Sequence, residues 1–224
     1  MEELWPKIED YCRTHGIAAV GCSRPDSPPL AKLPVALSLV VPLSRAVVEE
    51  ITDRPTHSYF HHYRTVNAFI DRSLLEIGLL LQGAGYEYLP IAASQSIPDA
   101  AGCGFQGRFS HKQAAVAAGL GGIGMNDLFL HPQYGCAVRL GTLFTEAPLP
   151  CSTRPYDTPC TGCGACVRAC PAAALRGIRW EPGCSVSPVD APACSEYMKR
   201  AFQKIGRGAV CGICIKACPI GKKP

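Results

Sequence analysis

The sequence predicts an α+β protein with an α/β domain over residues 1–150 and a small cysteine-rich domain over residues 151–224. Patterns typical of strands and helices alternate in the first part, which indicates an α/β domain. Two closely spaced cysteine runs lie in the second part. Residues 148–159, which include four prolines, form the expected linker between the two domains. At 224 residues and 47% hydrophobic content, the chain is long enough for one medium core and one small core.

The first 92 residues predict helices and strands in alternation. Apolar residues recur at helical spacing in two segments, and Gly16 and Gly83 are suited to end those helices. Shorter continuous apolar runs indicate buried strands. The expected elements are helices over residues 2–15 and 58–82 and strands over residues 17–22, 35–41 and 86–92.

A long glycine-containing loop, residues 94–109, precedes a short helix that starts with a capping box from Ser110 to Gln113. The sequence GLGGIG at residues 119–124 follows this helix. It matches the letters of the dinucleotide fingerprint but does not lead from a strand into a helix, so we reject dinucleotide binding. Residues 128–130 and 136–144 then bracket a five-residue loop and predict a β-hairpin.

The run from Cys160 to Pro171 has the spacing C-x2-C-x2-C-x3-C-P, which is typical of bacterial ferredoxins. In that pattern three thiolates hold one iron–sulfur cluster and the fourth reaches a second cluster. The run from Cys211 to Pro219 repeats it without the first cysteine, and Cys194, 17 positions before Cys211, can supply the missing ligand.

The cysteines therefore predict a ferredoxin-like domain with two [4Fe–4S] clusters. Zinc prefers two separated pairs of cysteines, and disulfides need an oxidising compartment that nothing in the sequence indicates. The expected ligands are Cys160, Cys163, Cys166 and Cys218 for the first cluster, and Cys170, Cys194, Cys211 and Cys214 for the second. The remaining six cysteines are expected to be reduced thiols with some burial: Cys12, Cys22, Cys103, Cys136, Cys151 and Cys184.

Charge is divided unevenly between the two parts. Residues 1–150 carry 11 basic and 14 acidic side chains, whereas residues 151–224 carry 11 basic and 4 acidic ones. Thiolate-bound clusters are negative, so nearby Arg and Lys offset their charge, which explains the basic excess better than nucleic-acid binding does. His57 and His61 have the spacing of a metal pair on a helix, but no third ligand is apparent, so we expect ordinary histidines.

Neither an export signal nor an apolar run of membrane-spanning length is present in the sequence, so we expect a cytoplasmic protein without a membrane partner.

Residues 110–126, 132–135 and 139–149, together with the double-cluster cysteine pattern, resemble the epoxyqueuosine reductase family. This family is related to corrinoid-dependent reductive dehalogenases, and the resemblance runs from about Ile17 to Gly221. It implies a nitroreductase-like, corrinoid-binding N-terminal domain that receives electrons from two clusters. It also implies that Gly119, Gly121, Gly124 and Asn126 contact the cofactor, and that cobalamin binds without a histidine ligand from the protein.

The chain departs from the family pattern in two ways. Members that act on tRNA continue into helical repeats, and this sequence stops at Pro224, so tRNA is not expected as a partner without a further domain. The family's aspartate proton donor matches Asp99 only loosely, because extra residues separate Asp99 from the short helix. Tyr59 and Tyr63 are further candidates for this proton donor.

Three functions remain open. The first is a cobalamin-dependent reductase with a small-molecule substrate, and the second is an electron carrier or an activase that reduces a corrinoid partner. The third is an epoxyqueuosine reductase that needs a separate tRNA-binding subunit. Each needs a redox partner such as a ferredoxin-like or flavodoxin-like donor, and a flavin is the alternative to cobalamin as the bound cofactor.

Overall fold

The computed structural model describes residues 4–98, 104–154, 156–181, 186–207 and 210–222. Its contacts divide the chain into two compact units. The first, the sheet unit, comprises residues 1–42, 66–121 and 139–157, and the second, the cluster unit, comprises residues 43–65, 122–138 and 158–224. The units therefore alternate along the chain, whereas the sequence analysis expected one boundary at residue 150. No described helix is both long and apolar enough to cross a bilayer.

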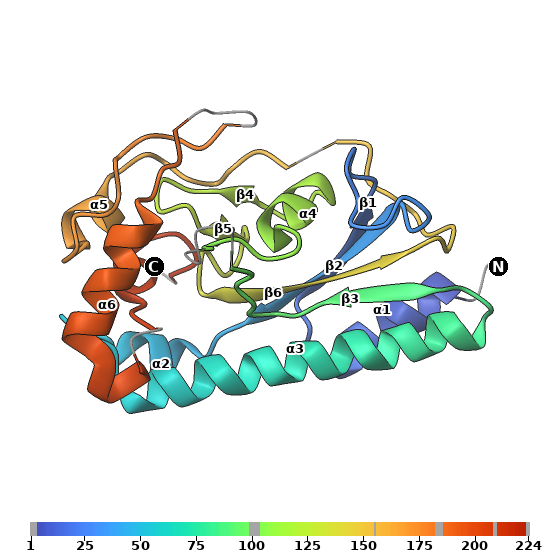
Figure 1. Ribbon diagram of the computed structural model, residues 1–224, viewed down its shortest axis with the longest axis horizontal. Coiled ribbons are helices and arrows are strands. Elements are labelled where there is room, and N and C mark those ends of the chain that lie inside the picture. The colour runs from blue at the N-terminus through green and yellow to red at the C-terminus, as the bar shows by residue number, and fades with distance from the viewer. Residues whose placement is uncertain (1–3, 99–103, 155, 182–185, 208–209, 223–224) are drawn as a thin grey trace. The chain divides into compact units, whose positions relative to one another are not determined.

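A four-stranded sheet in the order β1-β2-β6-β3 forms the centre of the sheet unit (Figure 1). Its strands are β1 (Ala19–Ser23), β2 (Val35–Pro42), β3 (Tyr88–Ile91) and β6 (Val138–Thr145). β1 pairs antiparallel with β2, and β3 pairs antiparallel with β6. The first seven residues of β2 are buried, which agrees with its uninterrupted run of mainly apolar side chains.

Helices cover both faces of this sheet. α1 (Leu4–Thr14) and α3 (His57–Gly83) lie on one face, and α4 (His111–Ala117) lies on the other (Figure 1). Gly141 of β6 lies directly against Ile70 and Leu74 of α3, where a side chain would not fit. On the opposite face, Ala114 of α4 packs in an apolar cluster with Phe144 and other buried residues of the sheet.

The cluster unit contains the short α2 (Arg45–Glu49), the beginning of α3, a two-stranded hairpin and three helices. The hairpin consists of β4 (Gly122–Ile123) and β5 (Phe129–Leu130). The helices are α5 (Ala165–Ala169), α6 (Ala191–Gly206) and α7 (Ile213–Ala217).

The predicted hairpin of residues 128–130 with 136–144 forms only as one isolated antiparallel bridge, between His131 and Gly135, and not as a ladder of two strands. β5 pairs with β4 instead, and β6 belongs to the main sheet. The reason is an Asx turn that the sequence analysis did not recognise. The Asn126 side-chain oxygen accepts a hydrogen bond from Leu128 N, and Asp127 adopts a left-handed conformation with φ of 57°. This turn reverses the chain before residue 128.

Candidate iron–sulfur cluster sites

The two cysteine runs fold into the same local structure. Gly164 and Gly212 precede α5 and α7 in left-handed conformations, with φ of 70° and 80°. Cys170 and Cys218 end the two helices in extended conformations, and each amide nitrogen donates a 3.2 Å hydrogen bond to the carbonyl three residues earlier. The repeat seen in the sequence is therefore a structural repeat, and each copy presents its thiols around one helical turn.

The first set of predicted ligands lines one cavity. Its lining includes Cys160, Cys163, Cys166 and Cys218. The walls between these thiols are mainly apolar, with Met125, Leu130 and Ile220 among the lining residues. A cavity lined by four cysteines and apolar side chains suits a cubane, because a [4Fe–4S] cluster takes four cysteine ligands and its potential depends on exclusion of solvent.

The second set is also brought together. Burial raises the pKa of Cys194, and the charge of the nearby Cys170 raises it further. Burial raises the pKa of Cys211 to about 11, and the charges of Cys194 and Cys170 contribute. Burial also raises the pKa of Cys214, with contributions from Cys211, Cys194 and Cys170. The four thiols of this set are thus mutual neighbours.

Cys194 is presented by the first turn of α6. Asp190 caps this helix, and its side chain accepts a hydrogen bond from Ala193 N at 3.0 Å. The helix begins at Ala191, directly after this cap. The cap fixes the start of α6 and so fixes the position of a ligand that lies far in sequence from its partners.

These thiols suit clusters rather than a single ion. Among the described residues, no group of three or more His, Cys, Asp or Glu side chains could hold one metal ion. A cubane spreads its four cysteine ligands over separate irons, so it does not need the close convergence that one ion requires. Burial raises the pKa of four of the ligand thiols, which favours their protonated form, and binding of iron would release those protons. These four are Cys166, Cys194, Cys211 and Cys214.

A ninth cysteine, Cys136, lies at the first set and was not predicted there. Its side chain is buried and hydrogen-bonds with the ligand Cys218. Asn126 Nδ2 donates to Cys136 Sγ at 3.6 Å, and Cys136 Sγ lies 3.8 Å from Ile215 O. The hydrogen bond from Cys136 lowers the pKa of the Cys218 thiol. Sequence spacing could not reveal this contact, because Cys136 lies outside both cysteine runs.

Gly135 explains part of the resemblance around residues 132–135. Its Cα lies against the backbone of Ile220 and Gly221, so that a side chain at this position would overlap the chain just after Cys218. Its φ of 57° also favours glycine. This glycine therefore allows the tail of the second cysteine run to pack closely.

The residues expected to contact a corrinoid lie in closely packed parts of the structure. A side chain at Gly119 would meet Ser152, and one at Gly124 would meet Leu130 and Asn126. Gly121 is buried, and the Asn126 side chain is buried and lines the first cluster cavity. The neighbouring protein atoms thus account for the close packing at Gly119 and Gly124, and the cofactor role of all four residues stays a prediction.

Of the candidate proton donors, the structure describes Tyr59 and Tyr63. Asp99 lies outside the described residues, as do Cys103 and Cys184. Tyr59 is 2% exposed, and its ring occupies the space where a side chain at Gly212 would lie. Tyr63 is partly buried. His57 and His61 are exposed on the first turns of α3, and the structure gives no indication that they hold a metal.

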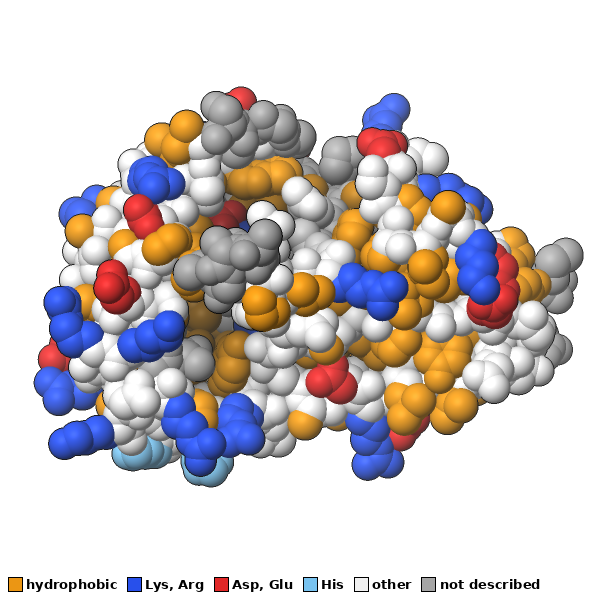
Figure 2. Space-filling view, viewed as in Figure 1, with side chains coloured by type: hydrophobic (Ala, Val, Ile, Leu, Met, Phe, Trp, Pro, Cys, Tyr) orange, Lys and Arg blue, Asp and Glu red, His pale blue; other side chains and the backbone are white. Residues whose placement is uncertain are grey.

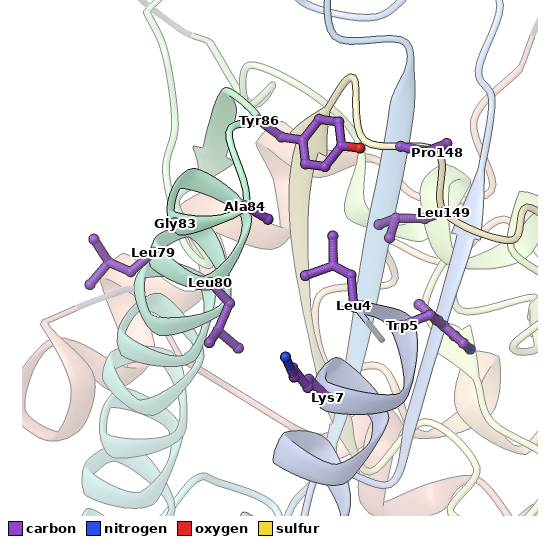
Figure 3. Close-up of a pocket in the computed structure, with 10 residues that line it drawn as sticks. All are labelled: Leu4, Trp5, Lys7, Leu79, Leu80, Gly83, Ala84, Tyr86, Pro148 and Leu149. Carbon is purple, nitrogen blue, oxygen red and sulfur yellow. The ribbon is translucent and has the colours of Figure 1, made fainter. Parts of the chain in front are cut away.

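The sheet unit contains a separate cavity of about 530 Å³ between α1 and the end of α3 (Figure 3). Leu4 from α1 and Leu80 from α3 lie on opposite sides of it, and Tyr86 and Leu149 lie at its upper end (Figure 3). Its lining is mainly apolar, with Lys7 and Tyr86 as polar members, and contains no cysteine that could hold a cluster.

Residues 159–221 match the family described as a 4Fe-4S double cluster binding domain. This match contains both cysteine runs and Cys194. The match confirms the prediction of iron–sulfur clusters in this segment, and the assignment of individual ligands stays a prediction.

Two curated relatives confirm the resemblance seen in the sequence. The chain is 36% identical over 98 residues to epoxyqueuosine reductase from Listeria monocytogenes serovar 1/2a, which covers 44% of this chain and 24% of that protein. It is 32% identical over 115 residues to tetrachloroethene reductive dehalogenase from Sulfurospirillum multivorans, which covers 48% of this chain and 23% of that protein. The matches therefore span about a quarter of the length of these relatives.

Solved structures of both groups share the fold. A reductive dehalogenase, described as suggesting a mechanism for B12-dependent dehalogenation, has a TM-score of 0.74 at 19% identity, over 96% of this chain and 32% of that chain. Epoxyqueuosine reductase from Streptococcus thermophilus has a TM-score of 0.63 at 18% identity, over 98% of this chain and 66% of that chain. The shared fold thus includes nearly the whole of this chain.

Proposed function

We propose that this protein is a corrinoid-dependent reductase in which two [4Fe–4S] clusters deliver electrons to cobalamin. The observation that carries the proposal is the assembly of eight cysteines into two sets of four, one around a common cavity and one as mutual neighbours. The double-cluster match and the similarity to two groups of reductases support an iron–sulfur oxidoreductase.

The protein's own residues hold the clusters and shape their surroundings. Cys160, Cys163, Cys166 and Cys218 would hold the first cluster, and Cys170, Cys194, Cys211 and Cys214 the second. Such clusters supply one-electron transfers when bound. Arg168 stabilises the first cysteine loop, because its Nη1 donates a 3.0 Å hydrogen bond to Cys163 O. Its positive charge offsets the negative charge of thiolate-bound iron.

The corrinoid part of the proposal has different support. The shared fold with a structure described in terms of B12-dependent dehalogenation favours a nitroreductase-like, corrinoid-binding sheet unit. The described residues do not identify a place for the ring. An added side chain at Gly119 or Gly124 would meet protein atoms, and the Asn126 side chain hydrogen-bonds with Cys136 and Leu128. Asp99 remains the proposed proton donor on the resemblance alone, and we derive no reaction step through it or through the corrinoid.

The remaining aspects of this proposal concern partners and location. A ferredoxin-like or flavodoxin-like protein would supply electrons in the cytoplasm, and a small molecule would be the substrate. An electron carrier or an activase that reduces a corrinoid held by another protein is the second candidate. Protein packing accounts for Gly119 and Gly124 without a bound ring, which favours this second candidate, because it needs the clusters but no corrinoid of its own.

Two measurements on anaerobically reconstituted protein test the proposal. Iron and sulfide analysis should give about eight of each per chain, as eight cysteine ligands require. Titration with hydroxocobalamin should show saturable binding, with a Co(II) spectrum by electron paramagnetic resonance that lacks nitrogen hyperfine structure from a histidine. Eight irons without saturable cobalamin binding would contradict the reductase and leave the flavin-binding alternative and the second candidate. About four irons would contradict the double-cluster assignment itself.

A further inference from the structure

α6 has a strongly basic face opposite its cluster ligand. At 3.6 residues per turn, five polar residues fall on one side of this helix, and Cys194 and the buried Phe202 fall on the other side. The polar residues are Glu196, Lys199, Arg200, Gln203 and Lys204, all of them exposed. Arg207, which directly follows the helix as its C-cap, is also exposed and joins this set. We call this set the α6 basic face, and it has four cations for one carboxylate.

The cations of the α6 basic face are not neutralised locally. Among the described residues, Lys199, Lys204 and Arg207 form no ion pair, and the Arg200 guanidinium lies over the Tyr197 ring at 5.5 Å. Figure 2 shows Lys and Arg side chains gathered over the region where α6 lies in Figure 1. Unpaired cations on one face produce a positive potential that attracts anionic partners.

This face borders an open hollow beside the second set of cluster ligands. The hollow has a volume of about 560 Å³ and contains Lys199 and Arg200 among its lining residues. Pro171, which directly follows Cys170, and Ala193, which directly precedes Cys194, also line it. Cys170 and Cys194 are neighbours in space. The basic face and the second cluster ligands therefore meet at one depression of the surface.

We propose that the α6 basic face and this hollow are the docking surface for an acidic electron-carrier protein. This inference rests on the proposed function, because it presumes that the clusters receive electrons from a partner. In the step itself the reduced carrier loses one electron, and the second cluster gains that electron. No covalent bond forms or breaks. The acidic carrier is held by complementary charge, and its redox group lies over the hollow.

An acidic protein fits this surface better than a nucleic acid does. The basic residues occupy one face of a single 16-residue helix, with the carboxylate of Glu196 among them. A phosphate backbone would meet that carboxylate, whereas a protein can place a lysine or a polar side chain against it. The depression next to two cluster ligands has a use in electron transfer and none in backbone binding.

Charge reversal on the α6 basic face tests the docking surface. The variant Lys199→Glu/Arg200→Glu/Lys204→Glu and the wild-type protein are reconstituted and checked for equal iron content. Cluster reduction is then followed by stopped-flow absorbance with an acidic bacterial ferredoxin as the donor. We expect the second-order rate constant to fall at least tenfold at low salt, and the difference to vanish at high salt, because electrostatic steering is screened.

Two controls separate docking from other effects. Lys32→Glu alters an exposed lysine of the sheet unit and should leave the rate unchanged. Photoreduced 5-deazaflavin, a small donor that needs no protein docking surface, should reduce the triple variant as fast as the wild type. Equal ferredoxin rates for the triple variant and wild type would overturn the proposal. So would a triple variant that keeps its ferredoxin rate but loses binding of an RNA stem-loop, since the face would then serve nucleic acid.

The same samples distinguish this inference from the proposed function. If ferredoxin reduces the clusters in a manner dependent on the α6 basic face but added cobalamin is neither bound nor reduced, the reductase proposal fails and the docking surface stands. If deazaflavin-reduced protein reduces cobalamin normally and charge reversal has no effect on ferredoxin, the docking surface fails and the reductase proposal stands.

Discussion

The buried thiol of Cys136 hydrogen-bonds with the ligand thiol of Cys218, although the two residues are far apart in the sequence. Cys136 is itself fixed by Asn126, whose Nδ2 lies 3.6 Å from its Sγ. Hydrogen bonds to cluster sulfurs are one of the ways in which proteins set reduction potentials. Cys136 is therefore placed to adjust the first cluster without being one of its ligands.

Removing this hydrogen bond should lower the reduction potential of the first cluster. Cys136→Ala leaves the eight ligands in place but takes away a donor that favours the more negative, reduced state. Cys136→Ser keeps a donor and should restore much of the potential. The potentials are read from a redox titration monitored by electron paramagnetic resonance, with Cys12→Ala as the control for loss of a buried thiol elsewhere. An unchanged potential in Cys136→Ala would contradict this role.

Cys194, rather than Cys184, should complete the second cluster. The structure places Cys194 beside Cys170 and Cys211, and Cys184 lies outside the described residues. Cys194→Ser should reduce the iron content from about eight to about four per chain, since the second set would lose one of four ligands. Cys184→Ser should keep the full iron content. The opposite pattern in iron analysis would refute the assignment.

The two glycines that precede the short helices provide a matched pair. At either position alanine must adopt a left-handed conformation, which costs about 1–2 kcal/mol. At Gly164 the new methyl group would meet only the end of the flexible Arg168 side chain, at 3.0 Å. At Gly212 it would lie 2.7 Å from the Tyr59 ring and 2.8 Å from Ile51, which adds an overpacking cost of about 1–3 kcal/mol.

We therefore expect Gly212→Ala to be the more damaging substitution by a clear margin. Its thermal midpoint should fall several degrees further than that of Gly164→Ala, and its iron content should fall as well. Both variants are compared with wild type by thermal unfolding and iron analysis after the same reconstitution. An equal fall in thermal midpoint for the two variants would show that the Tyr59 and Ile51 side chains can move aside at little cost.

Much of this fold was predictable because its elements have clear patterns. The long helix predicted over residues 58–82 is α3, and the buried strand predicted over residues 35–41 is β2. The strand rests on a continuous apolar run, and its burial follows that run. The helix rests on apolar residues at helical spacing, but Leu75 and Leu79 are exposed, and the buried side contains Leu74, Ile77 and Leu81 instead. The two ligand sets stay a prediction, which rests on the short, fixed spacing that cluster chemistry imposes on cysteines.

Contacts between distant segments could not be read from the sequence. The pairing of β5 depended on the turn at Asn126 and Asp127, where a side chain hydrogen-bonds with the backbone. The place of Cys136 beside Cys218 depended on the close approach that Gly135 allows. At Gly119 and Gly124 an added side chain would meet protein atoms, so packing alone accounts for both glycines, and their predicted role beside a flat cofactor stays a prediction.

His111 should make the stability of the sheet unit depend on pH. Its Nε2 donates to Ala92 O at 3.0 Å, so that its Nδ1, 2.8 Å from Thr142 Oγ1, must accept. Burial lowers the pKa of His111 below its ordinary value of 6.5, and the charge of Arg139 adds to this effect. The hydrogen bond to Ala92 and the charge of Asp71 oppose the shift without reversing it.

Because the pKa of folded His111 is lowered, the protein should become less stable as the pH falls. Below pH 6.5 the unfolded chain binds a proton at His111 before the folded protein does. The stabilisation from neutral His111 is therefore complete above pH 6.5 and is lost as the pH falls toward the lowered pKa of the folded protein. Within that window the free energy of unfolding should fall by at most about 1.4 kcal/mol per pH unit through this residue.

His111→Gln removes the titration while keeping a donor that can reach Ala92. Thermal midpoints of wild type and variant are measured between pH 8 and pH 5 in matched, reconstituted samples. The variant should be less stable than wild type at pH 8, and the difference should shrink as the pH falls below 6.5. Acid also lowers stability through protonation of carboxylates and loss of clusters, but this affects both proteins and cancels in the comparison. A difference that is constant across the pH range would show that protonation of His111 does not contribute to stability.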